Sequence, residues 1–83
     1  MTREAIRAAV IESLTSVAPE IDPSSIEPDS EFRLAYDLDS MDVLNFAIAL
    51  HARLKVSVPE ADYPRLATLN RAVAYLEQRL ASA

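Results

Sequence analysis

The stretch LDSMDVLNFAIALHARL, residues 38–54, takes the chain from a polar loop into an apolar helix. Asp39 is the best N-cap of this helix, because its carboxylate can accept a hydrogen bond from a free backbone N–H group. Asp42 stands at the third helical position, where it completes an acidic capping arrangement. The stretch therefore predicts a helix over residues 40–54 with Ser40 as its first residue.

Two apolar stripes run along this predicted helix. The expected core stripe is Val43, Phe46, Ala47, Leu50 and Leu54. A second stripe, at steps of three and four residues, is Met41, Leu44 and Ile48. One stripe is enough to pack a helix onto a core, so the surplus indicates a surface for a partner or a cargo. The alternative is that the second stripe is also core.

Apolar periodicity predicts two further long helices. The first covers residues 3–18, with Thr2 as N-cap and Pro19 as its stop. The last covers residues 69–81, capped by Thr68.

Between these helices the chain is irregular. Residues 19–39 contain three prolines and predict a long crossover loop, a length unusual in a compact domain. Its expected anchors to the core are Ile21, Ile26, Phe32, Leu34 and Leu38. Residues 60–66 predict one or two helical turns, with Tyr63 and Leu66 inward and Pro64 near the start. The fold class that follows is all-α: a small antiparallel bundle of three main helices plus one short helix.

The composition restricts the function. Thirteen acidic against eight basic residues give a net charge of −5, which disfavours nucleic acid and favours basic protein partners. The absence of glycine excludes glycine-rich phosphate loops, and the absence of cysteine excludes disulfides and thiolate metal sites. The 83 residues are expected to form one domain, 1–83, and a monomer. Without an apolar span or a signal-peptide h-region, the expected location is cytoplasmic.

The run Leu38-Asp39-Ser40-Met41-Asp42 resembles the phosphopantetheine attachment motif of acyl carrier proteins, which is usually Asp-Ser-Leu followed by Asp or Glu. The resemblance covers nearly the whole chain. It includes the long first loop, the serine at the start of the second helix, the Val58-Pro59 break and the Ala67-Thr68-Leu69 entry to the last helix.

The resemblance implies a stand-alone carrier that catalyses nothing itself. A phosphopantetheinyl transferase would move 4′-phosphopantetheine from coenzyme A to Ser40, and Asp39 would orient the serine or contact the transferase's metal. The thiol of the arm would hold an acyl or aminoacyl group as a thioester, between an acyl- or amino-acid-activating ligase and downstream transferases. The implied partner-binding residues are Met41, Asp42, Leu44 and Ile48.

Two departures from the family pattern concern the partner. The run Ala35-Tyr36-Asp37 lacks the glycine of many fatty-acid carriers, and the second helix has Asp42 as its only acid. Both disfavour a generic fatty-acid role and favour a dedicated partner that recognises apolar surface. The stretch Val58–Pro64 resembles that of small carriers paired with amino-acid-activating ligases.

Two other classes of function are less well supported. The alternative from a different class is an unmodified helical adaptor that binds a partner through the second helix. A Ser-His-Asp enzyme is disfavoured, because His51, the only histidine, lies about 16 Å of helical rise from Ser40. The cluster of Asp37, Asp39 and Asp42 is read as helix-start electrostatics, with no resident metal expected.

Overall fold

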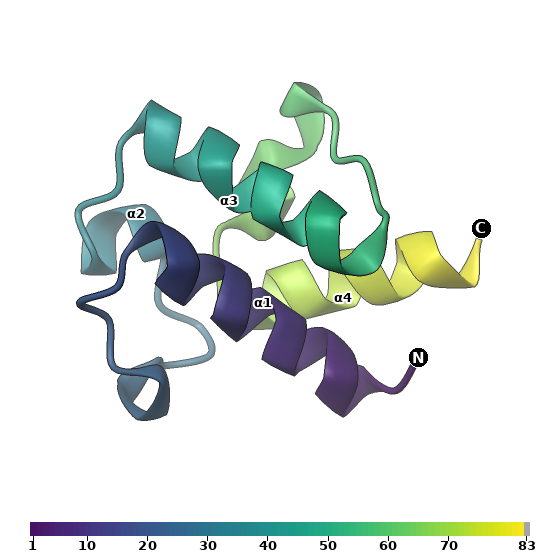
Figure 1. Ribbon diagram of the computed structural model, residues 1–83, viewed down its shortest axis with the longest axis horizontal. Coiled ribbons are helices and arrows are strands. Elements are labelled where there is room, and N and C mark those ends of the chain that lie inside the picture. The colour runs from purple at the N-terminus through teal and green to yellow at the C-terminus, as the bar shows by residue number, and fades with distance from the viewer. Residues whose placement is uncertain (83) are drawn as a thin grey trace.

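A computed structural model describes residues 1–82 as a bundle of helices (Figure 1). The three long helices are α1 (Arg3–Val17), α3 (Ser40–Leu54) and α4 (Leu69–Ala81), and η2 (Glu60–Leu66) is a shorter 3₁₀ helix. Helix α1 runs in the opposite direction to α3 and α4 and contacts both (Figure 1). The predicted fold class, three main helices plus one short helix, is confirmed.

The predicted helix boundaries are nearly correct. The hydroxyls of Thr2 and Thr68 each accept a hydrogen bond of 3.1 Å from the backbone N–H group three residues later. Both are therefore the N-caps that the sequence predicts. Helix α1 ends at Val17, one residue earlier than expected, because Ala18 precedes Pro19 and proline disfavours a helical conformation in the residue before it.

One hydrophobic core lies between the three long helices. Its most deeply buried large side chains come from all of them: Ile6, Val10, Leu14, Phe46, Leu50, Leu69 and Leu76. Exposed ion pairs such as Arg3–Glu77 (2.9 Å) add about 1 kcal/mol at most, so apolar burial is the main stabilising contribution. No helix within residues 1–82 is long and apolar enough to cross a membrane.

The first connection is more ordered than the sequence predicts. It contains a 3₁₀ turn, η1 (Pro23–Ser25), and one turn of α-helix, α2 (Phe32–Ala35). The backbone N–H of Phe32 donates to Ala67 O (2.8 Å), and that of Asn70 donates to Pro28 O (3.0 Å). These bonds fix the long connection to the start of α4, which is why its length is tolerated.

Four of the five expected anchors of this connection are confirmed. Ile21, Ile26, Phe32 and Leu38 are buried. The prediction for Leu34 is wrong, because its side chain is 81% exposed. In the helical turn α2, residues two apart point about 200° away from each other. Phe32 faces the core, so Leu34 is turned to solvent.

Helix η2 forms over the predicted residues, but its proline is placed differently. Pro64 is the fifth residue of η2 rather than near its start. Leu66 is buried as predicted, and Tyr63 is half-buried against the core.

A hydrogen-bonded link joins η2 to α4. The Tyr75 hydroxyl donates to the Asp62 carboxylate (2.6 Å) and accepts from Arg79 (2.7 Å). Arg79 also donates to the Ser57 carbonyl oxygen (3.0 Å). The link fixes both the extended segment before η2 and η2 itself against the last helix.

Candidate functional site

The chain turns sharply just before α3. Asp37 adopts a left-handed conformation (φ 53°), which aspartate tolerates better than most residues. The next residue, Leu38, is buried, and its N–H donates to Arg33 O (3.2 Å). The turn therefore returns the chain to the core and fixes where α3 begins.

The start of α3 has the capping arrangement that the sequence predicts. The Asp39 carboxylate accepts from the N–H of Asp42 (2.9 Å), and the Asp42 carboxylate accepts from the N–H of Asp39 (3.1 Å). Ser40 follows as the first helical residue and is exposed. Its hydroxyl lies at the positive end of the helix dipole, a favourable place for a negatively charged group.

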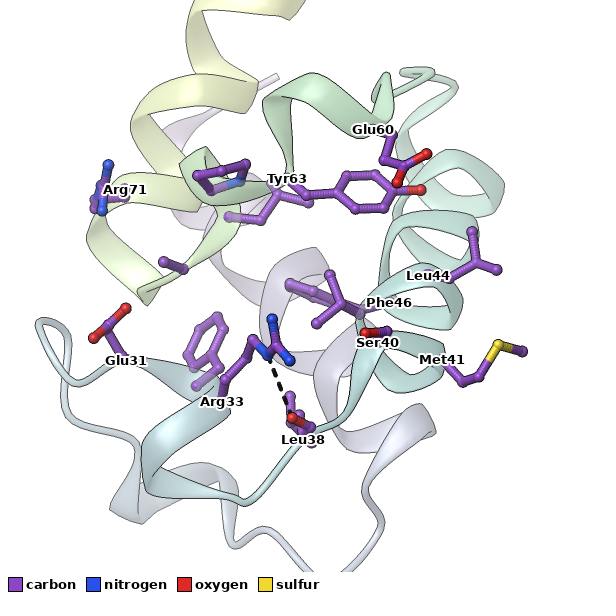
Figure 2. Close-up of a pocket in the computed structure, with 15 residues that line it drawn as sticks. Glu31, Arg33, Leu38, Ser40, Met41, Leu44, Phe46, Glu60, Tyr63 and Arg71 are labelled. Atoms are coloured by element: carbon purple, nitrogen blue, oxygen red, sulfur yellow. Dashed lines mark hydrogen bonds between the residues drawn. The ribbon is translucent and has the colours of Figure 1, made fainter.

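A cavity of about 630 Å³ opens beside Ser40 (Figure 2). It lies between α2, the first half of α3, η2 and the start of α4, and most of its lining is apolar. The lining residues are Glu31, Phe32, Arg33, Leu38, Ser40, Met41, Val43, Leu44, Phe46, Glu60, Tyr63, Pro64, Leu66, Ala67 and Arg71. In Figure 2, Ser40, Met41 and Leu44 lie on the α3 side, and Glu31 and Arg71 lie at the other end. An apolar space of this size next to an exposed serine can shelter a chain attached to that serine.

The second apolar stripe of α3 is exposed. The exposed fractions of Met41, Leu44 and Ile48 are 61%, 38% and 57%. Four residues of the predicted core stripe are buried, whereas Val43 is only half-buried and lines the cavity. The alternative that both stripes belong to the core is therefore excluded.

Charges are distributed unevenly along α3. Asp42, in the first turn, is its only acidic residue, and His51 and Arg53 lie in the last turn. Arg53 pairs with Glu12 of α1 (3.6 Å), and Lys55, which ends the helix, is exposed. His51 is exposed on α3, far along the helix from Ser40. Within residues 1–82, no cluster of three or more His, Asp or Glu side chains could hold a metal ion.

The carrier resemblance implies a cargo cavity with Met41, Leu44 and Ile48 at its mouth, but sequence reasoning missed the walls outside α3. These walls come from segments that the sequence places far apart, including Arg33 of α2, Tyr63 of η2 and Arg71 of α4. The available signal was Arg33, a cation within the apolar run from Phe32 to Ala35.

Comparisons with known proteins agree with this geometry. Residues 8–76 match the family model described as a phosphopantetheine attachment site. The chain belongs to this family. An acyl carrier protein from Helicobacter hepaticus is 29% identical over 76 residues, which cover 92% of this chain and 93% of that protein. The meromycolate extension acyl carrier protein of Mycobacterium tuberculosis is 31% identical over 78 residues, which cover 94% and 67% of the two chains. The meromycolate extension acyl carrier protein of Mycolicibacterium smegmatis is 30% identical over 77 residues, which cover 93% of this chain and 77% of that protein.

The chain is thus a carrier protein of the acyl-carrier type, and its prosthetic group is covalently bound 4′-phosphopantetheine. The local structure fits that group in two respects. An exposed serine hydroxyl stands at the start of a 15-residue helix, where a phosphodiester is stabilised. The adjoining cavity is lined mainly by apolar side chains, which suits an acyl chain.

Proposed function

We propose that Ser40 is the attachment residue of this carrier protein and that the exposed stripe of α3 binds its partner enzymes. The observation that supports this most strongly is the position of Ser40. It is an exposed serine between a capped helix start and the mouth of an apolar cavity. Within residues 8–76, the segment matched by the family, no other serine lines this cavity.

Asp39 and the helix dipole at the start of α3 favour modification of Ser40 by a transferase. The Ser40 hydroxyl loses its proton and its oxygen bonds to phosphorus of coenzyme A, while the pyrophosphate bond breaks and releases adenosine 3′,5′-bisphosphate. Asp39 uses one carboxylate oxygen for the cap of α3, which leaves the other to orient the serine or contact the transferase's metal. The helix dipole favours the new negative charge. When attached, the group supplies a flexible arm whose thiol holds the cargo as a thioester.

The chain itself is not an enzyme in this proposal. Ser40 has no histidine near it, because His51 lies about 16 Å further along α3. The contribution of the carrier is to tether the cargo, which presents it to each partner at a high effective concentration. Catalysis belongs to the transferase, to an activating ligase and to downstream transferases.

The exposed stripe and Asp42 form the proposed docking surface. Met41 and Leu44 lie at the cavity mouth as well as on the surface, so a partner that covers them also covers the exit of the cargo. Exposed apolar side chains beside a single acid favour a partner that recognises apolar surface more than charge. A small docking area of this kind suits transient binding and easy release.

The proposed cargo is an acyl group. The relatives from H. hepaticus and M. tuberculosis are both named acyl carrier proteins, and the second is named for meromycolate extension. An amino-acid-activating ligase remains the alternative partner, suggested by the stretch Val58–Pro64. The two are distinguished by presenting the holo protein to fatty-acid enzymes and to amino-acid-activating ligases. Efficient fatty-acid elongation with a steep loss of rate in salt would contradict apolar recognition, because salt screens exposed charge pairs.

The attachment site is tested by intact-mass measurement after incubation with coenzyme A and a broad-specificity transferase. Wild-type protein should gain the mass of one phosphopantetheine, and Ser40→Ala should gain none. Ser57→Ala is the matched control, since Ser57 is also exposed but does not line the cavity. Peptide mapping should locate the added mass on Ser40. Full modification of Ser40→Ala would refute the assignment, and no modification of wild type by several active transferases would favour the adaptor.

A further inference from the structure

Arg33 is an exposed cation beside a cavity whose lining is mainly apolar. It is the second residue of α2 and lines the same apolar cavity as Ser40. Its Nε donates to the backbone carbonyl oxygen of Leu38 (3.4 Å), and the N–H of Leu38 donates back to Arg33 O (3.2 Å). The two bonds join α2 to the residue that lies two positions before Ser40. Figure 2 shows the guanidinium turned toward the start of α3.

Most N–H donors of the exposed Arg33 guanidinium have no protein partner among residues 1–82. A guanidinium carries five N–H donors, and here one of them has a partner among residues 1–82. The three ion pairs within this part of the chain involve Arg3, Arg53 and Arg79, so Arg33 has no carboxylate oxygen of residues 1–82 within 4.0 Å. The acidic residues around the turn therefore leave this cation free to bind another anion at the cavity.

Modification creates an anion at this place. A phosphodiester on the Ser40 oxygen carries one negative charge at any ordinary pH, and the covalent bond keeps it next to Ser40. Guanidinium N–H groups match phosphate oxygens in geometry and form charge-assisted hydrogen bonds with them. We propose that Arg33 binds the phosphodiester attached to Ser40 and so holds the base of the arm at the mouth of the cavity. This inference rests on the proposed attachment at Ser40.

Such a contact would select where the arm points. The helix start already favours the phosphodiester, but its N–H groups do not distinguish an arm directed into solvent from one directed into the cavity. Arg33 lies on the cavity side of Ser40 (Figure 2). If the phosphodiester is bound to Arg33, the remainder of the arm begins next to Met41 and Leu44, at the cavity mouth.

The test uses holo protein with a free thiol and follows the phosphodiester by phosphorus NMR. Wild type is compared with Arg33→Gln, Arg33→Lys and the control Arg71→Gln. Arg71 is a suitable control because it also lines the cavity and has no carboxylate of the described residues, 1–82, within 4.0 Å, but lies at the other end (Figure 2). The intact mass of every sample is measured first.

In wild type the phosphorus signal should differ from that of the same protein unfolded in urea, and salt should reduce the difference. Arg33→Gln should move the signal toward the unfolded value, with a loss of up to about fivefold in the ratio of bound to free phosphodiester. Arg33→Lys should give an intermediate signal, because an ammonium keeps the charge without the planar fork. Arg71→Gln should match wild type.

Each other outcome overturns the inference in a recognisable way. Protein that gains no mass refutes the attachment proposal and the inference together. Modified Arg33→Gln with a wild-type signal refutes the inference alone. In a second sample the arm carries the half-thioester of a dicarboxylic acid. This sample tests whether Arg33 binds a carboxylate of the cargo instead of the phosphodiester. An effect of Arg33→Gln that occurs only in that sample would show that Arg33 binds a cargo carboxylate, and would overturn its assignment to the phosphodiester.

Discussion

The separation of the core from the proposed docking surface on α3 can be tested by truncating one residue of each. Leu50 is fully buried, so Leu50→Ala removes a large side chain from the core and should cost about 2–5 kcal/mol. Met41 is 61% exposed. Full burial of a methionine stabilises by about 1.5–3 kcal/mol, so the two-fifths that is covered contributes about 0.6–1.2 kcal/mol. The greater helix propensity of alanine offsets a few tenths of that loss.

Urea unfolding of the apo proteins measures this difference. With a slope near 1 kcal/mol per M, Leu50→Ala should lower the midpoint by about 2 M or more and Met41→Ala by about 1 M or less. A Leu50→Ala protein that is unfolded even without urea would also agree with a core position for Leu50, because a domain of this size has only about 4–12 kcal/mol of stability.

The same two variants separate stability from partner binding. Met41→Ala should be folded yet slow in loading by the transferase or in transfer to a partner enzyme, because it removes part of the proposed docking surface. Equal destabilisation by the two changes would place Met41 in the core and refute the reasoning. Unchanged loading and transfer by a folded Met41→Ala protein would show that the exposed stripe is not the docking surface.

Three other predictions concern single side chains. Ser13 is fully buried and its hydroxyl has no partner among residues 1–82, so Ser13→Ala should raise the unfolding free energy by about 1 kcal/mol, measured in urea. Burial, and then the hydrogen bond to a carboxylate, raise the pKa of Tyr75 above 10.0. The stability that Tyr75 contributes is therefore present below pH 10 and lost as the pH rises through its higher folded-state pKa; thermal unfolding between pH 8 and 11 should show this loss in wild type and less of it in Tyr75→Phe. Asp39→Ala should lose about 0.5–2 kcal/mol with the cap of α3, whereas Asp37→Asn, which removes the same charge and tolerates the left-handed turn, should lose less.

The features of this fold that the sequence predicts are local ones. Helices of 13 to 15 residues repeat their apolar spacing several times, so α1, α3 and α4 are predicted to within one residue. The N-caps Thr2, Asp39 and Thr68 are predictable because a cap bonds to a backbone group only three residues away.

The features that it does not predict depend on tertiary contacts. Helix α2 has four residues, too few to show a period, so its apolar Leu34 could not be distinguished from its buried neighbour Phe32. The cavity has walls from four separate elements, and no local pattern encodes their meeting. The proposed attachment serine, Ser40, is predictable because its motif is contiguous, whereas Arg33 lies near it only through the fold of the first connection.

The geometry of α3 allows one helix to contribute to the core and also to present the proposed docking surface. At about 100° per residue, Met41 and Leu50 lie nine residues and hence about 180° apart around the helix. Leu44 and Ile48 fall within about 60° of Met41, and Phe46 falls within about 40° of Leu50. The exposed stripe and the buried stripe are therefore opposite faces, as their exposed fractions also indicate. A partner can cover and release the outer face without disturbing the packing of the inner one. Ser40 begins the helix on which both faces lie, so the packing of the core sets the position of the proposed attachment point.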